Sequence, residues 1–291
     1  RSRPGRRGDR RPPVRRRCRL SMATVVFLHA HPDDEALATG GTMARMADAG
    51  HRVVLVVATS GEEGEPVPGV LADGESLGDR RVAELDEAAT ILGVERVVNL
   101  AYRDSGMAGD DANDHPDCFW QADVDDAARR LARALADEEP DVLVVYDPDG
   151  GYGHPDHIQV HRVGHRWAEI ADIDRVRWVT MNRDAIRASI EAALADEGSW
   201  SDEGMLELRR ERAESESFGM PDAEITHAID VSAVIGRKRA AIAAHASQIG
   251  PASFFLAMPE EQFAMVFGTE WFVDPGSPRR GRPQRTDLLL A

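Results

Sequence analysis

Short apolar runs alternate with segments of helical spacing through the first 180 residues. The four runs are TVVFLHA (24–30), RVVLVVATS (52–60), ERVVNLAY (95–102) and DVLVVYD (141–147). Short runs rich in valine and leucine are typical of parallel strands that are buried on both faces. The alternation therefore predicts an α/β fold, a Rossmann-like doubly wound and mostly parallel sheet with helices on both faces.

The pattern becomes less regular after residue 181, which indicates a smaller C-terminal α/β extension. We expect a single domain over 22–274, with the Rossmann-like core at about 22–181 and the extension at 182–274. Within the extension, 223–231 could form a strand and 236–250 is predicted to form a helix closed by Gly250.

The two ends of the chain differ in composition from its body. Residues 1–21 contain ten arginines and one aspartate, a charge of +9, so the rest of the chain carries −25 of the total of −16. With almost no apolar side chains, this leader is expected to be disordered. The tail 275–291 is also predicted to be disordered.

Charge and cysteine content exclude several classes of function. A strongly acidic body argues against nucleic-acid binding, and no apolar run reaches the ~18 residues that a membrane span needs. Cys18 and Cys118 are the only cysteines. A disulfide framework is therefore not expected, and a reducing cytoplasm fits.

Two histidine-acid motifs stand where the first and fourth predicted strands end. HAHPDDE (29–35) follows one strand and GGYGHPDH (150–157) follows the other. Ligands of open parallel sheets bind beyond the carboxyl ends of the strands, so both motifs would face one crevice if those strands are neighbours. Either motif alone could be a turn or a helix cap, but together they favour a metal site.

Imidazole and carboxylate ligands together suit zinc, which in catalytic sites has three protein ligands and one open position. His31 and Asp34 can converge across the Pro32 turn, and His157 can supply the third ligand. Asp33 would then lie beside the metal as a general base. For the developing oxyanion, the sequence offers His154, held in position by Asp156, and Tyr152 as a second donor.

These motifs resemble those of the LmbE-like, or PIG-L, zinc-dependent N-acetylglucosamine deacetylase superfamily. The resemblance covers about 23–271 and rests on AHPDDE (30–35) with HPDH (154–157). It includes TSGEEGE (59–65), RVAEL (81–85), YRDSGM (102–107) and AHASQ (244–248). YDPDGGYGHPDH (146–157) is similar to the mycothiol-biosynthesis branch, the N-acetylglucosaminyl-inositol deacetylases.

The resemblance implies a metal-dependent hydrolase that removes the N-acetyl group from an N-acetylglucosamine-type sugar conjugate. It implies His31, Asp34 and His157 as ligands of Zn²⁺ or Fe²⁺. It further implies that Arg81, Asp104 and Glu63 contact the sugar, and that the partner is a small amino-sugar conjugate.

Two related functions stay open: a mycothiol-conjugate amidase of the same superfamily, and a non-catalytic sugar-binding relative. The sequence lacks the motifs that two other classes of protein require. A nucleotide-binding Rossmann protein needs a glycine-rich phosphate loop where this chain has acids, and a serine hydrolase needs a G-x-S-x-G turn that is absent.

Overall fold

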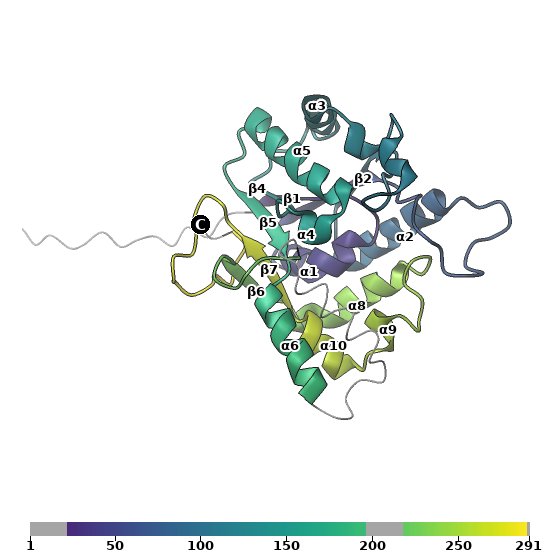
Figure 1. Ribbon diagram of the computed structural model, residues 1–291. Coiled ribbons are helices and arrows are strands. Elements are labelled where there is room, and N and C mark those ends of the chain that lie inside the picture. Colours follow the sequence, from purple (N-terminus) through teal and green to yellow (C-terminus); the bar gives the residue numbers. More distant parts are fainter. Residues whose placement is uncertain (1–21, 196–217, 290–291) are drawn as a thin grey trace, which may run out of the picture.

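A seven-stranded sheet in the order β3-β2-β1-β4-β5-β7-β6 forms the centre of the protein. The structure is a computed structural model that describes residues 22–195 and 218–289 (Figure 1). The strands are β1 (Thr24–His29), β2 (Arg52–Thr59), β3 (Arg96–Tyr102), β4 (Val142–Tyr146), β5 (Val176–Thr180), β6 (His227–Asp230) and β7 (Thr269–Val273). The first four lie within the predicted strand segments.

Strands β1 to β5 pair in parallel, which confirms the predicted mostly parallel sheet. β1 pairs with β2 on one side and with β4 on the other. The strand order therefore reverses between β1 and β4, and this reversal is where open α/β sheets bind ligands. The two strands that end in the histidine-acid motifs are thus direct neighbours, as the sequence reading required.

Helices cover both faces of the sheet. In Figure 1, α3 and α5 lie above the sheet, whereas α1, α2 and α8 lie below it. Their bounds are α1 (Gly40–Asp48), α2 (Leu77–Leu92), α3 (Val124–Ala134), α4 (Gly150–Gly153), α5 (Pro155–Ala171), α6 (Arg183–Ala195), α8 (Ile235–Ala244), α9 (Phe254–Ala257) and α10 (Glu260–Phe267). A π-helical turn, η1 (Glu35–Thr39), precedes α1, and short 3-10 turns are η2 (Asp111–Asp114), η3 (Phe119–Gln121) and η4 (Ser232–Val234).

Helix α5 packs very closely on β4, because Gly164 faces the strand. A Cβ atom at Gly164 would lie 2.4 Å from Val145 Cγ1, closer than any side chain allows. The same helix begins with the HPDH motif, so this contact fixes where its histidines lie.

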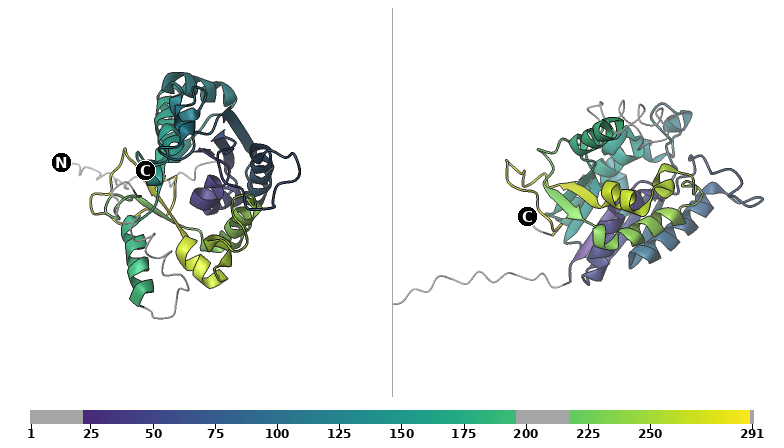
Figure 2. Two further views of the ribbon diagram at one scale, coloured as in Figure 1. Left: turned by 45° about the vertical axis from the view of Figure 1, so that its right-hand side comes forward. Right: turned by 90° about the horizontal axis from the view of Figure 1, so that it is seen from below.

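The C-terminal extension is joined to the core on two sides. β7 adds antiparallel to β5, and β6 adds antiparallel to β7. The extension also contacts the core through α8, which packs against α1 and α2 (Figure 2). The predicted helix over 236–250 is too long: α8 ends at Ala244, because His245 turns into the interior instead of continuing the helix.

The prediction of a disordered tail is wrong for most of its length. Residues 275–289 are described, Arg285 forms a β-bridge with His227, and Leu288 is completely buried. The predicted leader 1–21 and residues 196–217 of the predicted extension lie outside the described residues. No helix in the described ranges is long and apolar enough to cross a membrane.

Candidate metal and catalytic site

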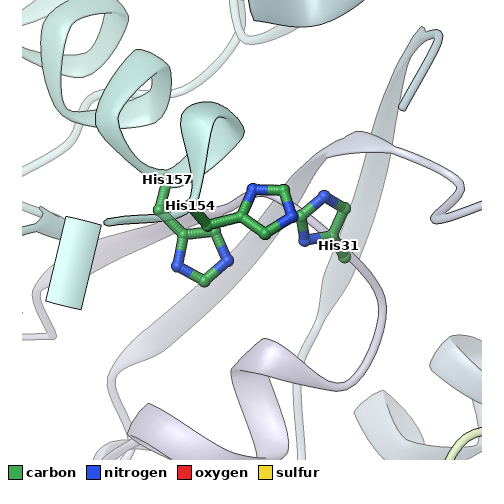
Figure 3. Close-up of side chains that lie close together, drawn as sticks. All are labelled: His31, His154 and His157. Carbon is green, nitrogen blue, oxygen red and sulfur yellow. The ribbon is translucent and has the colours of Figure 1, made fainter. Parts of the chain in front are cut away.

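The two histidine-acid motifs meet at the carboxyl ends of β1 and β4. His31 lies just beyond β1, while His154 and His157 lie at the start of α5, which follows β4. Figure 3 shows the three side chains side by side, with the ring of His154 between those of His157 and His31. The centroid of the His154 ring lies 4.6 Å from that of His31 and 4.9 Å from that of His157.

Asp34 lies between two of these histidines. Its Oδ2 atom is 3.3 Å from His31 Nδ1 and 3.3 Å from His157 Nε2. Burial opposes ionisation of Asp34, but His157 and His31 outweigh it and hold the pKa of this carboxyl well below its usual range. Asp34 therefore connects the two predicted histidine ligands, and all three side chains are buried.

The hydrogen bonds of His157 favour a cation at this centre. Its Nδ1 lies 3.1 Å from the carbonyl oxygen of Gly150, which can only accept, so Nδ1 carries the proton. Nε2 can then present a lone pair to a cation, and it has no hydrogen-bond partner among the described residues. A cation beside Nε2 and Asp34 Oδ2, which lie 3.3 Å apart, would bind both atoms. Tetrahedral zinc with ligands at ~2.0–2.1 Å separates neighbouring ligand atoms by about 3.3–3.4 Å, which fits this spacing.

His31 is held from its opposite side. Its Nε2 atom lies 3.3 Å from Asp156 Oδ2 and 3.4 Å from Asp104 Oδ1. Ser105 donates its backbone N–H and its hydroxyl to the Asp156 carboxylate, which fixes the acid in place. A carboxylate behind a metal-binding histidine sets its tautomer and strengthens it as a ligand. His31 thus presents Nδ1 to Asp34 and keeps Nε2 for the acids behind it.

The described part of the chain contains two overlapping groups of three side chains that could hold a metal ion. Within each group, the potential ligand atoms lie within 4.8 Å of one another. The groups are His31 with His154 and His157, and His31 with Asp104 and Asp156. Burial lowers the proton affinity of His31, but bonds to Asp104, Asp156 and Asp34 outweigh it and raise its pKa well above the usual value. The same negative field that binds a proton there would bind a divalent cation.

Asp33 lies beside this centre in a strained backbone conformation. Its φ angle is 104°, a region that residues with a side chain rarely adopt. Arg81 Nη2 donates to Asp33 Oδ2 over 3.2 Å and to the carbonyl of Pro32 over 2.5 Å. Burial is the main reason that the pKa of Asp33 is raised to about 6, with Arg81 opposing it. A carboxylate with this proton affinity suits general-base work near neutral pH.

His154 is a neutral hydrogen-bond donor that faces the same centre. Its Nδ1 accepts the backbone N–H of Asp156 over 3.1 Å and so caps α5, which leaves the ring proton on Nε2. Burial, followed by the fields of His31 and His157, lowers the pKa of His154 to about 3. Asp156 does hold His154, but through its backbone N–H, because the carboxylate of Asp156 is bonded to His31 and Ser105.

Tyr152 lies at the open side of the site, on the short turn α4. Its ring centroid is 5.0 Å from that of His157 and 6.3 Å from that of His154, and 39% of the residue is exposed. Gly151 before it has a φ of 76°, which breaks the helical turn and lets the tyrosine reach over the histidines.

The three predicted sugar contacts differ in exposure: Arg81 and Asp104 are buried, whereas Glu63 is exposed. Asp104 is 3% exposed and lies behind His31, and its contact with the sugar stays a prediction. Arg81 is also buried and donates to the carbonyls of Gly61 and Pro32. Glu63 is exposed but pairs with Arg103 over 2.5 Å. Sugar contacts by Arg81 and Glu63 remain predictions.

Several buried side chains around the site were not assigned from the sequence. Tyr146, at the end of β4, stacks on His157 with 4.1 Å between ring centroids and 10° between planes. Its hydroxyl accepts the N–H of Ala30 over 3.1 Å and interacts with Asp34. His245 binds Glu35, with 2.6 Å between Nε2 and Oε1. The tyrosine stood in a quoted motif and could have been found there, whereas the His245 contact depends on the tertiary fold.

Comparisons with known proteins give a consistent result. Residues 26–168 match the PIG-L family, described as GlcNAc-PI de-N-acetylase. The chain is 41% identical over 287 residues to the 1D-myo-inositol 2-acetamido-2-deoxy-alpha-D-glucopyranoside deacetylase of Thermobifida fusca, covering 91% of this chain and 98% of that protein. It is 42% identical over 256 residues to deacetylase 1 of the same name from Catenulispora acidiphila, covering 80% and 78%.

A solved structure shares the fold at lower identity. The N,N'-diacetylchitobiose deacetylase from Pyrococcus horikoshii superposes with a TM-score of 0.51 at 23% identity, over 86% of this chain and 82% of that one. The fold, the motifs and the extent of the sequence identity agree, and the chain therefore belongs to the PIG-L family of GlcNAc-PI de-N-acetylases.

Proposed function

We propose that this protein hydrolyses the acetamide of N-acetylglucosaminyl-inositol to free amine and acetate, with zinc or ferrous iron as its cofactor. The observation that supports hydrolysis is the placement of Asp33 and the neutral His154 beside the centre shared by His31, Asp34 and His157. The sugar substrate is taken from relatives that carry this activity in their names and match nearly the whole chain.

His31 Nδ1, Asp34 Oδ2 and His157 Nε2 would hold the metal. A bound divalent cation makes water more acidic and offsets negative charge that develops on the amide. Asp33 takes a proton from the water that attacks the acetyl carbon. His154 donates its Nε2 proton as a hydrogen bond to the carbonyl oxygen as negative charge develops on it. Cleavage of the C–N bond releases acetate, and the leaving nitrogen takes the proton that Asp33 accepted from water, which restores the base.

Tyr152 is proposed as a second hydrogen-bond donor to the developing oxyanion. The position of its ring, beside His157 and open to solvent, supports this role because a substrate carbonyl entering from that side would meet its hydroxyl. The acidic partner of His31 is Asp156, so we assign Asp156 to the support of the metal ligand and not to catalysis.

The test is a comparison of substrates with metal-loaded and chelator-treated protein. Release of free amine from N-acetylglucosaminyl-inositol is expected with Zn²⁺ or Fe²⁺ and should disappear after metal removal. A cysteinyl amide of the mycothiol-conjugate type, assayed in parallel, distinguishes the amidase alternative. Absence of turnover on every N-acetyl sugar, with a full complement of metal, would favour the non-catalytic sugar-binding alternative.

A further inference from the structure

Glu35 links Asp33 to a histidine from the C-terminal extension. Glu35 Oε2 accepts the backbone N–H of Asp33 over 2.9 Å, and Glu35 Oε1 lies 2.6 Å from His245 Nε2. Glu35 and His245 are both completely buried. The two residues are 210 positions apart in the chain, so this contact exists only in the folded protein.

The backbone of Asp33 needs such support. At a φ of 104° it occupies a conformation that costs of the order of 1–3 kcal/mol and persists only where the surroundings hold it. Arg81 holds the side chain and the preceding carbonyl of Pro32 from one side. Glu35 accepts the backbone N–H of Asp33 from the other side. These contacts together restrict the orientation of the Asp33 carboxylate.

Among the contacts that the structure gives for His245, none is to the predicted metal ligands. Its Nε2 is bonded to Glu35, and its backbone N–H donates to Ile242 at the end of α8. A neighbouring pair provides a comparison: Ser247 donates its N–H and its hydroxyl to Glu84 on α2, over 2.9 and 2.6 Å. Both pairs join the segment after α8 to the core, but only the His245 pair continues to Asp33.

We propose that Glu35 and His245 form a positioning unit for Asp33, which aligns the general base and does not itself contact the substrate. The inference rests on the proposed function in one respect, the role of Asp33 as the base. Disruption of the unit should leave the three metal ligands in place and misdirect one carboxylate. A misplacement of this kind typically lowers kcat about 10–100-fold, while substrate binding changes little.

The decisive variants are His245→Ala, His245→Gln and Glu35→Asp, with Ser247→Ala as the matched control. His245→Ala removes the support of Glu35, and His245→Gln restores a donor near the position of Nε2. Glu35→Asp keeps the charge but is too short to reach both partners. Ser247→Ala breaks the neighbouring buried contact, which has no link to Asp33. For each, kcat, KM, metal content and melting temperature are measured on the full chain.

We expect kcat to fall about 10–100-fold in His245→Ala and Glu35→Asp, with unchanged KM and metal content, and to recover in His245→Gln. Ser247→Ala should lose stability but keep its kcat. The proposal is overturned if Ser247→Ala loses as much turnover as His245→Ala, or if Glu35→Asp turns over normally. If His245→Ala does not fold, the kcat of Glu35→Asp is compared with that of Ser247→Ala instead.

A second readout does not depend on turnover. Crystal structures of the parent and of Glu35→Asp should show the backbone of Asp33 leaving its φ of about 104° only in the variant. An inactive parent would contradict the proposed function, while this conformational change would still support the positioning unit. An unchanged Asp33 in an active parent and variant would contradict the unit alone.

Discussion

Three consecutive carboxylates, Asp33, Asp34 and Glu35, are each balanced by a different basic side chain. Asp33 pairs with Arg81, Asp34 lies between His31 and His157, and Glu35 pairs with His245. Three carboxylates can lie this close together because their side chains point in different directions and each contacts its own basic partner. Adjacent residues can therefore take the separate roles that we propose for them: base, metal ligand and support.

Substitutions of the two adjacent aspartates should separate catalysis from metal binding. Asp33→Asn keeps the shape and removes the base, so kcat should fall roughly 10²–10⁴-fold with the metal retained. Asp34→Ala removes the shared ligand, so the metal should be lost. Metal content by mass spectrometry and steady-state kinetics check both. Loss of metal from Asp33→Asn, with retention in Asp34→Ala, would reverse the assignment.

Tyr146 should tune metal affinity through the two proposed ligands that it contacts, His157 and Asp34. Tyr146→Phe keeps the ring that stacks on His157 but removes the hydroxyl that bonds Ala30 and interacts with Asp34. Loss of an outer contact of this kind should raise the metal dissociation constant about 10–100-fold, measurable by competition with a chelator. Tyr102→Phe, on β3 and packed against Phe119, is the control and should bind metal as the parent does. Equal metal affinities in the parent, Tyr146→Phe and Tyr102→Phe would show that the Tyr146 hydroxyl does not influence metal binding.

At the scale of elements, the sequence predicts what depends on local pattern. The runs that became β1 and β4 and the motifs that follow them were recognisable because apolar period and turn residues are local properties. The π-helical start at Glu35, the burial of Asp104 behind His31 and the His245 contact were not, since each depends on residues distant in sequence. Arg81 illustrates the limit: its motif was recognised, but not its bonds to two backbone carbonyls.

The close packing of α5 on β4 gives a prediction at this scale. Gly164→Ala would place a Cβ atom 2.4 Å from Val145 Cγ1 and push the helix that carries His154 and His157 away from the sheet. Overpacking of this kind should lower the free energy of unfolding by about 1–3 kcal/mol in urea titration. Gly236→Ala is the matched control: nothing lies within 4 Å of its Cβ position on α8, so stability should stay level or rise by up to about 1 kcal/mol. If Gly164→Ala leaves the free energy of unfolding unchanged, the contact between α5 and β4 can adjust to the added methyl group.

At the scale of the whole molecule, the C-terminal segment closes an open edge of the sheet. β6 is the last strand, and an unpaired edge strand exposes backbone groups that can pair with other chains. Arg285 donates its N–H to Thr226 and accepts the N–H of Ala228, so the end of the chain covers β6. The proline-, glycine- and arginine-rich composition before it predicted disorder, because the anchoring leucines form only a short apolar group at the very end.

This closure predicts that Leu288 contributes to global stability although it lies close to the end of the chain. Leu288 is completely buried, so Leu288→Ala should leave a cavity and lower the free energy of unfolding by about 2–5 kcal/mol. Thr286→Ala, two residues earlier and exposed, should change it by no more than about 0.5 kcal/mol. Urea unfolding of both variants and the parent provides the measurement. If Leu288→Ala unfolds at the same urea concentration as Thr286→Ala, the segment does not pack on the sheet in solution, and the original expectation of a disordered tail would be restored.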